Sequence, residues 1–207
     1  MRHWLTLLLL FCSAQTWAAD PQGIGMFQTL DKPWFVVALY ADGRPDDDGR
    51  PMVPQKLELR VVEDSISVRR YRKLWQDVFA VAQEREVWQT YAGDLQAFFQ
   101  LIKGPLEMND QLVIEQRAEA TVVSINYREH AVLSPGFLPL LVNTLTARIA
   151  PVPELRNGLL GELPEDETRS LMRQFDKSEP TLGRISETAR WLRRSAPAVT
   201  EARLSQL

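Results

Sequence analysis

A strand-like segment followed at once by a long amphipathic helix is the strongest pattern in this chain. In Leu57–Val62 apolar and polar residues alternate, as in a strand that buries one face. From Val68 to Ala82 apolar residues recur three and four positions apart, which places them on one stripe of a helix: Val68, Tyr71, Leu74, Trp75, Val78, Phe79 and Ala82. Ser65 or Ser67 can accept the free N–H groups at the start of this helix. A helix face that carries Tyr, Trp and Phe needs a broad apolar surface to cover, and neighbouring strands can supply it.

The remaining segments predict an α+β fold. We expect strands at Gly23–Asp31, Trp34–Ala41, Asp110–Glu115 and Ala120–Tyr127, and further helices at Asp94–Ile102, Phe137–Ile149, Leu155–Leu160, Glu165–Asp176 and Leu182–Ser195. Between the first two strands and Leu57–Val62, the Gly- and Pro-rich stretch Asp42–Pro54 predicts an exposed loop. This order lacks the strict strand–helix alternation of a doubly wound sheet. It favours a mostly antiparallel sheet with helices packed on one face.

Composition sets the class of protein and disfavours one kind of partner. The chain has 207 residues, of which 45% are hydrophobic and 25% charged, so it can fill a globular core. Its formal net charge of −3 gives no electrostatic reason to expect a nucleic-acid partner.

The first nineteen residues resemble a secretory signal peptide. Arg2 and His3 precede the apolar run Leu5–Cys12, and Thr16-Trp17-Ala18 suits cleavage after Ala18 or Ala19. The run is too short to span a bilayer unaided, which disfavours an uncleaved anchor. A lipoprotein, with lipid on Cys12, is also disfavoured, because bulky Phe11 stands where a small residue is expected. Cleavage would leave a chain without cysteine, so we expect a periplasmic protein held together by its core alone, with no transmembrane segment.

An ordered set of short segments resembles the chalcone isomerase-like family, in its bacterial exported branch. The segments are Gly23-Ile24-Gly25, Val37-Ala38-Leu39-Tyr40-Ala41-Asp42, the strand before the Tyr71-bearing helix, Asp110-Gln111-Leu112-Val113-Ile114, Asn126, Pro151-Val152-Pro153-Glu154-Leu155-Arg156 and Gly158-Leu159-Leu160-Gly161. The resemblance implies an open-faced β-sandwich, in which a curved antiparallel sheet and a layer of helices enclose a ligand cleft. It covers about Gly23–Gly161, so we expect a domain over residues 20–161 and a C-terminal helical appendage and tail over 162–207.

The resemblance also implies that isomerase chemistry is lost. In the plant enzymes an Arg holds the anionic oxygen of the substrate, helped by a Thr, a Tyr and an Asn. Motif matching places the Arg at about Phe27, the Thr at about Phe35 and the Asn at about Val78, so only Tyr71 keeps its type. Thr144 or Thr146 is a loose candidate for a further Thr. A site that stabilises an oxyanion loses its largest contribution without the cation and most of the donors.

Other candidate chemistry is weak. His130, the only histidine after the expected signal, has no Cys and no carboxylate cluster beside it except Glu129, and we expect a surface histidine in the turn Arg128–Ser134. Asp46-Asp47-Asp48-Gly49 lacks the alternate spacing and distant Glu of a calcium loop. Ser134-Pro135-Gly136 lacks the glycine pattern of a nucleophile elbow. We therefore expect neither a metal nor a cofactor.

Two groups on the long helix are candidate binding residues. Arg69 and Arg70, with Arg72 and Lys73, form either a solvated basic face or a site for an anionic head group. Tyr71 and Trp75, with Phe79, Phe98 and Phe99, are either plain core or the lining of a cleft for a long apolar ligand. The sequence leaves both pairs of readings open.

Three functional hypotheses follow. The first is a non-catalytic periplasmic protein that binds a fatty-acid-like molecule between the sheet and the long helix. Its ligand contacts would be Tyr71, Phe27, Phe35, Trp75, Val78, Thr144 and Thr146, with Arg69 and Arg70 as anion-binding residues. The second is a cell-envelope interaction protein that docks a partner through its C-terminal helices. The third is an isomerase or lyase that uses Tyr71 as a general acid.

Overall fold

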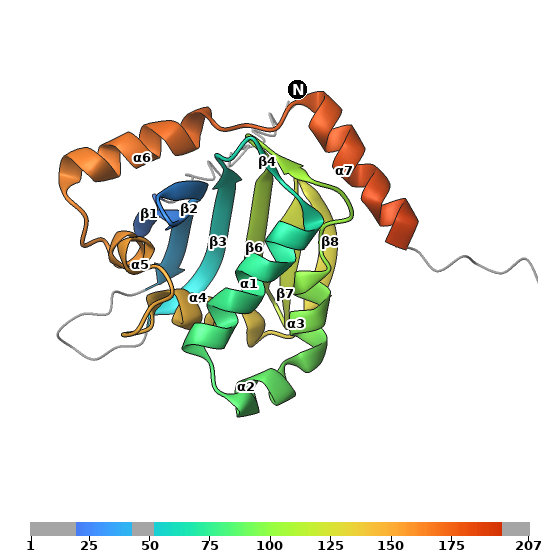
Figure 1. Ribbon diagram of the computed structural model, residues 1–207, viewed down its shortest axis with the longest axis horizontal. Coiled ribbons are helices and arrows are strands. Elements are labelled where there is room, and N and C mark those ends of the chain that lie inside the picture. Colours follow the sequence, from blue (N-terminus) through green and yellow to red (C-terminus); the bar gives the residue numbers. More distant parts are fainter. Residues whose placement is uncertain (1–19, 43–51, 196–207) are drawn as a thin grey trace, which may run out of the picture.

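An antiparallel six-stranded sheet forms the centre of the molecule (Figure 1). The computed structural model describes residues 20–42 and 52–195. The strand order is β1-β2-β3-β6-β7-β8, and the strands are β1 (Gly23–Thr29), β2 (Lys32–Asp42), β3 (Val53–Val61), β6 (Gln111–Arg117), β7 (Ala120–Ile125) and β8 (Arg128–Leu133). Two short strands, β4 (Ser65–Ile66) and β5 (Leu106–Glu107), pair separately.

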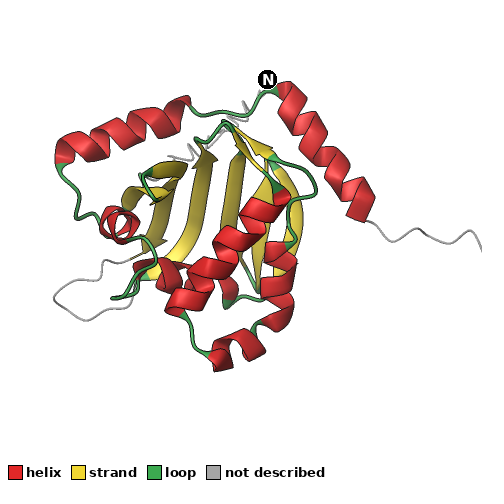
Figure 2. Cartoon of the chain, in the orientation of Figure 1, coloured by secondary structure: helices red, strands yellow, loops and turns green. Residues whose placement is uncertain are grey.

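One face of the sheet carries a layer of helices (Figure 2). The helices of the chain are α1 (Val68–Ala82), α2 (Arg85–Thr90), α3 (Ala92–Phe99), α4 (Phe137–Thr146), α5 (Pro153–Leu159), α6 (Glu165–Lys177) and α7 (Leu182–Ser195). The long helix α1 crosses in front of the central strands, while α4 contacts β3 and α5 lies along the edge strand β1. This arrangement confirms the predicted α+β class and its helical layer.

The alternation of each strand decides which side chains enter the core beneath α1. Phe35 pairs with Phe27 on one side and Val61 on the other, and Val37 pairs with Leu59, so apolar residues from neighbouring strands share one face. They join the buried stripe of α1 in a single core cluster. The predicted pairing of strand and helix is confirmed, and α1 covers the residues 68–82 that its periodicity predicts.

Helices α6 and α7 also pack on the body of the molecule. Leu171 and Phe175 of α6 bury themselves against Ile24, Val36 and Ala38, which lie on the second face of β1 and β2. In α7, Trp191 is buried in the main core cluster.

The α7 helix is also joined to the body by a buried ion pair. The guanidinium of Arg184 donates to both carboxylate oxygens of Asp110, with Nη2···Oδ2 at 2.6 Å and Nε···Oδ1 at 3.1 Å. Both C-terminal helices are therefore attached to the body, α6 through Leu171 and Phe175 and α7 through Trp191 and Arg184, while the domain boundary at residue 161 stays a prediction.

Four elements are absent from the sequence prediction: the short strands β4 and β5, strand β8 and helix α2. Residues 128–133 form β8 rather than a turn, so His130 is half-buried on a strand and the surface-loop expectation is wrong. The turn between β7 and β8 uses Asn126 and Tyr127, both with positive φ, and a Tyr there hides the hairpin signal, which is Asn-Gly. Helix α2 was missed because its six residues include no fully buried side chain.

Some boundaries differ from the prediction. Strand β3 begins at Val53, so Pro54 lies in a strand rather than a loop, and α4 ends at Thr146. The expected signal peptide, Cys12, the segment Asp46–Gly49 and the tail after Pro197 lie outside the described residues. Among the helices that are described, none is both long and apolar enough to cross a membrane.

Candidate functional site

The inward face of α1 forms an aromatic cluster with the sheet. The ring of Trp75 lies 5.8 Å from that of Phe27, 6.4 Å from that of Phe35 and 5.1 Å from that of Phe98. The Tyr71 ring adjoins both Trp75 and Phe98. All of these side chains are fully buried, so they form a packed core that fills the space between α1 and the strands.

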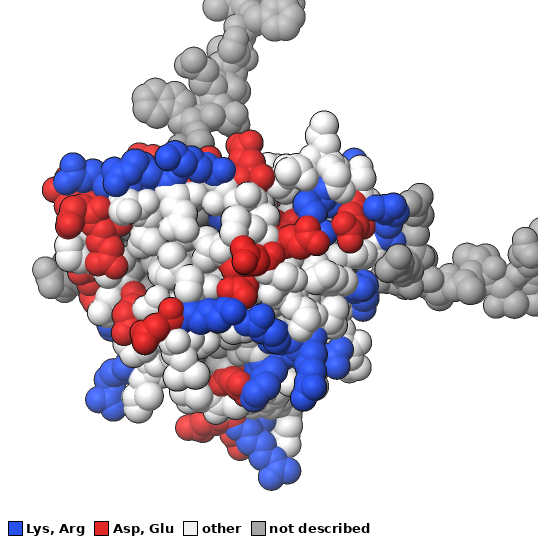
Figure 3. Space-filling model, turned by 45° about the horizontal axis from the view of Figure 1, so that its top comes forward, with Lys and Arg blue, Asp and Glu red and all other residues white. Residues whose placement is uncertain are grey.

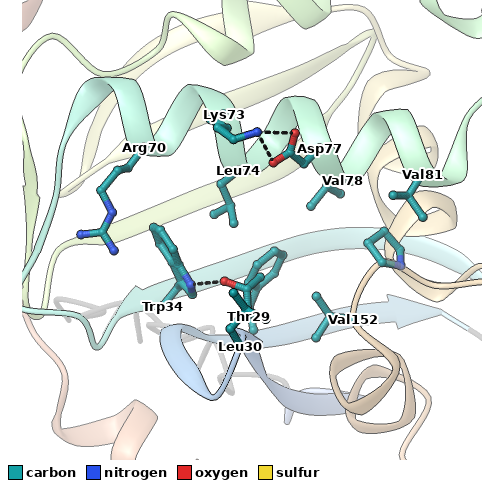
Figure 4. A pocket seen from close by; sticks show the side chains of 12 residues that line it. Thr29, Leu30, Trp34, Arg70, Lys73, Leu74, Asp77, Val78, Val81 and Val152 are labelled. Carbon is teal, nitrogen blue, oxygen red and sulfur yellow. Dashed lines mark hydrogen bonds and ion pairs between the residues drawn. The ribbon is translucent and has the colours of Figure 1, made fainter.

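Beside this core, a groove runs between one flank of α1 and the β1–β2 hairpin (Figure 4). Its apolar walls come from both elements and from the loop before α5, and the residues that line it are Phe27, Thr29, Leu30, Trp34, Arg70, Lys73, Leu74, Asp77, Val78, Val81, Pro151 and Val152. Its volume is about 340 Å³, at the lower end of the range for small-molecule sites. From Arg70 to Val81 the helix rises about 16 Å, which makes the groove elongated.

One end of the groove is cationic. The guanidinium of Arg70 lies 4.5 Å from the centre of the Trp34 ring and its Nη1 lies 3.5 Å from a carboxylate oxygen of Glu63. The Nζ of Lys32 lies 2.6 Å from the same oxygen. Two cations therefore share one carboxylate beside Trp34, close to the start of α1.

The middle of the groove is polar but neutral. Lys73 pairs with Asp77 along α1, with Nζ···Oδ2 at 2.9 Å, and the indole N–H of Trp34 donates to the hydroxyl of Thr29 at 2.8 Å. Figure 3 shows that blue cationic and red anionic side chains adjoin one another across this side of the molecule, with uncharged surface between them.

The other end of the groove is apolar, with Val81, Pro151 and Val152 and no charged lining residue. In Figure 4, Arg70 and Val81 mark the two opposite ends. A groove with a cation at one end, mostly apolar walls and an apolar far end is suited to a molecule with one anionic end and one long apolar part.

The tip of the β1–β2 hairpin stands at the edge of this groove. Leu30 and Asp31 form a two-residue turn with φ of 51° and 59°, which is the backbone of a type I′ turn. A leucine in this conformation costs about 1–2 kcal/mol relative to the right-handed region. Its side chain is also fully exposed, so the tip combines backbone strain with an uncovered apolar residue.

Only some of the sequence-predicted contacts line the groove. Phe27, Val78 and Arg70 do, whereas Tyr71, Trp75 and Phe35 belong to the aromatic core. Three further predicted residues, Thr144, Thr146 and Arg69, lie away from it.

Both threonines use their hydroxyls within the fold. The hydroxyl of Thr144 accepts from Gln83 and donates to the Leu140 carbonyl, and that of Thr146 donates to the Val142 carbonyl. Arg69 is exposed to solvent outside the groove.

The residues that sequence reasoning missed lie at the edges of buried patterns. Leu74 and Val81 flank the inward stripe of α1, beside the predicted Val78, and Trp34 and Leu30 lie at the hairpin end of the first two strands. The available signal was the second row of apolar residues on α1, at positions 74, 78 and 81, beside the aromatic row.

Burial leaves the hydroxyl of Tyr71 unsuited to proton transfer. The Oη of Tyr71 has no hydrogen-bond partner, and burial raises the pKa of this phenol well above its ordinary value. In the part of the chain that the structure describes, no three His, Cys, Asp or Glu side chains gather as metal ligands.

Comparison with known proteins supports the fold. No protein-family model matches the sequence, and no curated protein sequence matches it. Among solved structures, a fatty-acid binding protein of Arabidopsis thaliana is similar, with a TM-score of 0.50 and 13% sequence identity over 73% of this chain and 88% of that chain. At this identity the likeness shows the fold alone, which is the chalcone isomerase-like fold that the sequence segments indicate.

Proposed function

We propose that this chain binds a fatty-acid-like molecule in the groove between α1 and the β1–β2 hairpin. One observation carries the proposal: most residues that line the groove are apolar, and Arg70 at one end is the lining cation that pairs with no lining carboxylate. The carboxylate of the ligand would lie at Arg70, and its chain would run along Leu74 and Val78 toward Val152. The fatty-acid binding protein of similar fold supports this choice of ligand class.

The same geometry supports a binding protein over an enzyme. At the positions that the family resemblance aligns with the polar set of the plant isomerases, Phe27 and Phe35 pack against Trp75. Aromatic rings there provide no donor to a developing oxyanion. The use of Tyr71 as a general acid is further disfavoured by its place in the core, away from the groove.

Ligand identification tests the proposal most directly. Protein purified from its own host should release a fatty acid when its lipids are extracted and analysed by mass spectrometry. Ligand-free protein should melt at a higher temperature when a long-chain fatty acid is added, because a ligand that binds only the folded state stabilises it. An empty extract together with no thermal shift from any chain length would reject this function.

A pair of variants tests the position of the head group. Arg70→Gln should weaken fatty-acid binding by about tenfold or more, the effect of losing a charge-assisted hydrogen bond. Arg69→Gln is the matched control, because Arg69 neighbours Arg70 but lies outside the groove. Equal affinities for the two variants would place the carboxylate elsewhere.

The cellular setting belongs to the same proposal. The signal-like first nineteen residues support export to a bacterial periplasm, and the ordered segments support the exported branch of the chalcone isomerase-like family. The mass of the protein in a periplasmic fraction would establish cleavage after Ala18 or Ala19. A protein that keeps Met1 and remains in the cytoplasm would contradict this part. An envelope partner for α6 and α7 stays a prediction; Leu171, Phe175 and Trp191 of these helices are already buried within this chain.

A further inference from the structure

Three exposed apolar side chains lie at or beside the mouth of the groove. They are Leu30, Val81 and Ile149, among the eight large hydrophobic residues that are exposed in the described part of the chain. Leu30 and Val81 line the groove itself. Ile149 lies beside Val81 in an adjoining hollow and two residues before the groove residue Pro151.

These three residues come from three separate loops or ends. Leu30 is at the β1–β2 turn, Val81 is in the last turn of α1, and Ile149 is between α4 and α5. Their exposed fractions are 101%, 60% and 70%. Separate apolar tips around a hollow do not make the continuous, closely fitting surface of a protein interface. Such tips can each enter the interfacial region of a lipid bilayer, which needs no complementary shape.

Charged groups of both signs lie around the mouth. Arg148 adjoins Ile149 and is exposed, while Glu84 lines the same hollow and Asp31 follows Leu30 at the hairpin tip. At the other end Arg70 pairs with Glu63, and Lys73 pairs with Asp77. An arginine next to an inserted aliphatic residue can keep its guanidinium among lipid phosphates while its stem lies in the apolar region.

We propose that the mouth of the groove docks on a lipid bilayer, with Leu30, Val81 and Ile149 inserted at the level of the head groups. In this position the groove would open directly toward the lipid, so that an acyl chain could enter or leave without crossing water. The inference deepens the proposed function, since it states where the ligand is exchanged, and the experiments below separate the two.

A site-specific probe can test the contact. The one cysteine of the chain is Cys12, so the chain from Asp20 to Leu207, which contains every described element, has none. Leu30→Cys can therefore carry a single polarity-sensitive fluorophore. Leu182→Cys is the matched control, because Leu182 is 84% exposed at the start of α7 and away from the groove. With vesicles of phosphatidylcholine containing a quarter phosphatidylglycerol, the probe at position 30 should shift to the blue, and the probe at 182 should not.

Substitution provides the second test. Leu30→Asn and Ile149→Asn should each lower the partition constant for these vesicles, measured by flotation, by roughly tenfold, the change expected when one aliphatic side chain is no longer buried. Leu182→Asn should leave flotation unchanged. Asparagine also tolerates positive φ, so Leu30→Asn should not unfold the hairpin.

Each alternative result has a defined meaning. Failure of the unsubstituted chain to float, or equal loss in the Leu30 and Leu182 variants, would overturn the docking proposal. A position-30 shift that grows with protein concentration in the absence of vesicles would indicate a second copy of the chain and would also overturn it. Titration of dodecanoate in lipid-free buffer measures ligand binding in the groove separately. If the protein binds dodecanoate but does not float with vesicles, docking alone is rejected. If it floats but does not bind dodecanoate, the fatty-acid function alone is rejected.

Discussion

The hydroxyl of Tyr71 is buried in the core without a hydrogen-bond partner. An unpartnered buried polar group costs about 1–3 kcal/mol relative to a partnered one. We therefore expect Tyr71→Phe to leave the free energy of unfolding of the ligand-free protein unchanged or to raise it by about 1 kcal/mol, measured by urea denaturation. The exposed Tyr127→Phe is the control and should have little effect. A clear loss of stability in Tyr71→Phe would mean that the hydroxyl has a partner in solution.

His130 gives the molecule a pH-dependent stability. It packs edge-on against Trp191 with ring centres 6.2 Å apart, and burial lowers the pKa of its imidazole to about 4. In the unfolded chain the pKa is about 6.5, so between these values the unfolded state binds a proton that the folded state does not. Stability should consequently fall as the pH is lowered from 6.5 toward 4.

Urea midpoints at pH 7.0 and pH 5.0 check this expectation, since most carboxylates stay ionised at both values. The chain from Asp20 should unfold at a lower urea concentration at pH 5.0, and His130→Gln should show a smaller difference between the two conditions. The variant provides the control, because other titrating groups are common to both proteins. An unchanged difference would show that His130 is protonated in the folded state as readily as in the unfolded one.

At the scale of elements, the approach of α5 to β1 depends on glycine. A Cβ atom placed on Gly158 would lie 2.5 Å from the Cα of Gly25 and would also meet the carbonyl oxygen of Ile24. Both are backbone atoms, which cannot turn aside as a flexible side chain can. Gly158→Ala should therefore lower the free energy of unfolding by about 1–3 kcal/mol, the usual range for overpacking.

Gly93→Ala is the matched control for this prediction. Gly93 is also helical, in α3, but a Cβ atom there would have no neighbour within 4 Å. Alanine is the better helix former, so we expect a gain of about 0.5 kcal/mol. Chemical denaturation of the two variants, compared with the unsubstituted protein, measures the expected loss of stability in one and the expected gain in the other. Similar stabilities would mean that α5 can move away from β1 at little cost.

The elements that the sequence predicts correctly are those in which hydrophobic residues recur with a clear helical or strand period. The stripe of α1 and the alternation of β3, β6 and β7 are local signals, and the structure confirms them. Strand β8 was missed because its residues are mostly exposed or half-buried and its turn uses Tyr127 in place of glycine. Its pairing with β7 is a tertiary effect that no local pattern in residues 128–133 reveals.

At the scale of the whole molecule, Arg184 joins the last helix to the sheet. Its partner Asp110 is fully buried and also accepts from the side chain of Asn126 and the backbone N–H of Glu107. Arg184→Met would leave this carboxylate buried without its cation. We expect a loss of about 3–5 kcal/mol in the free energy of unfolding, measured by urea denaturation.

Two further variants show whether the loss of stability comes from the buried ion pair. Arg169→Met removes an exposed cation of α6 that pairs with Glu165, and should change stability by less than about 0.5 kcal/mol. Asp110→Asn combined with Arg184→Met removes both charges and should recover part of the lost stability. A single Arg184 variant as stable as the control would show that α7 is not required by the body of the molecule.

The candidate site was predictable only in outline. The sequence indicates that a ligand would lie between the sheet and the aromatic side of the long helix, but that space is filled by the core, and the groove lies beside it along the hairpin. The sequence does not indicate which flank of α1 is open, because that depends on the angle at which the helix crosses the strands. Tyr71 and Trp75 are consequently core, and the adjoining row of Leu74 and Val78 borders the groove. The exposed Leu30 has no sequence signal, because a single leucine in a turn is not distinctive.

The ion pair between Asp110 and Arg184 bridges 74 positions of the chain. Because a chain is synthesised from its amino end, the carboxylate leaves the ribosome long before the guanidinium. Until the last helix emerges, the start of β6 would carry a charge without its cation, which resists burial. We therefore expect the sheet to close around Asp110 only late in synthesis.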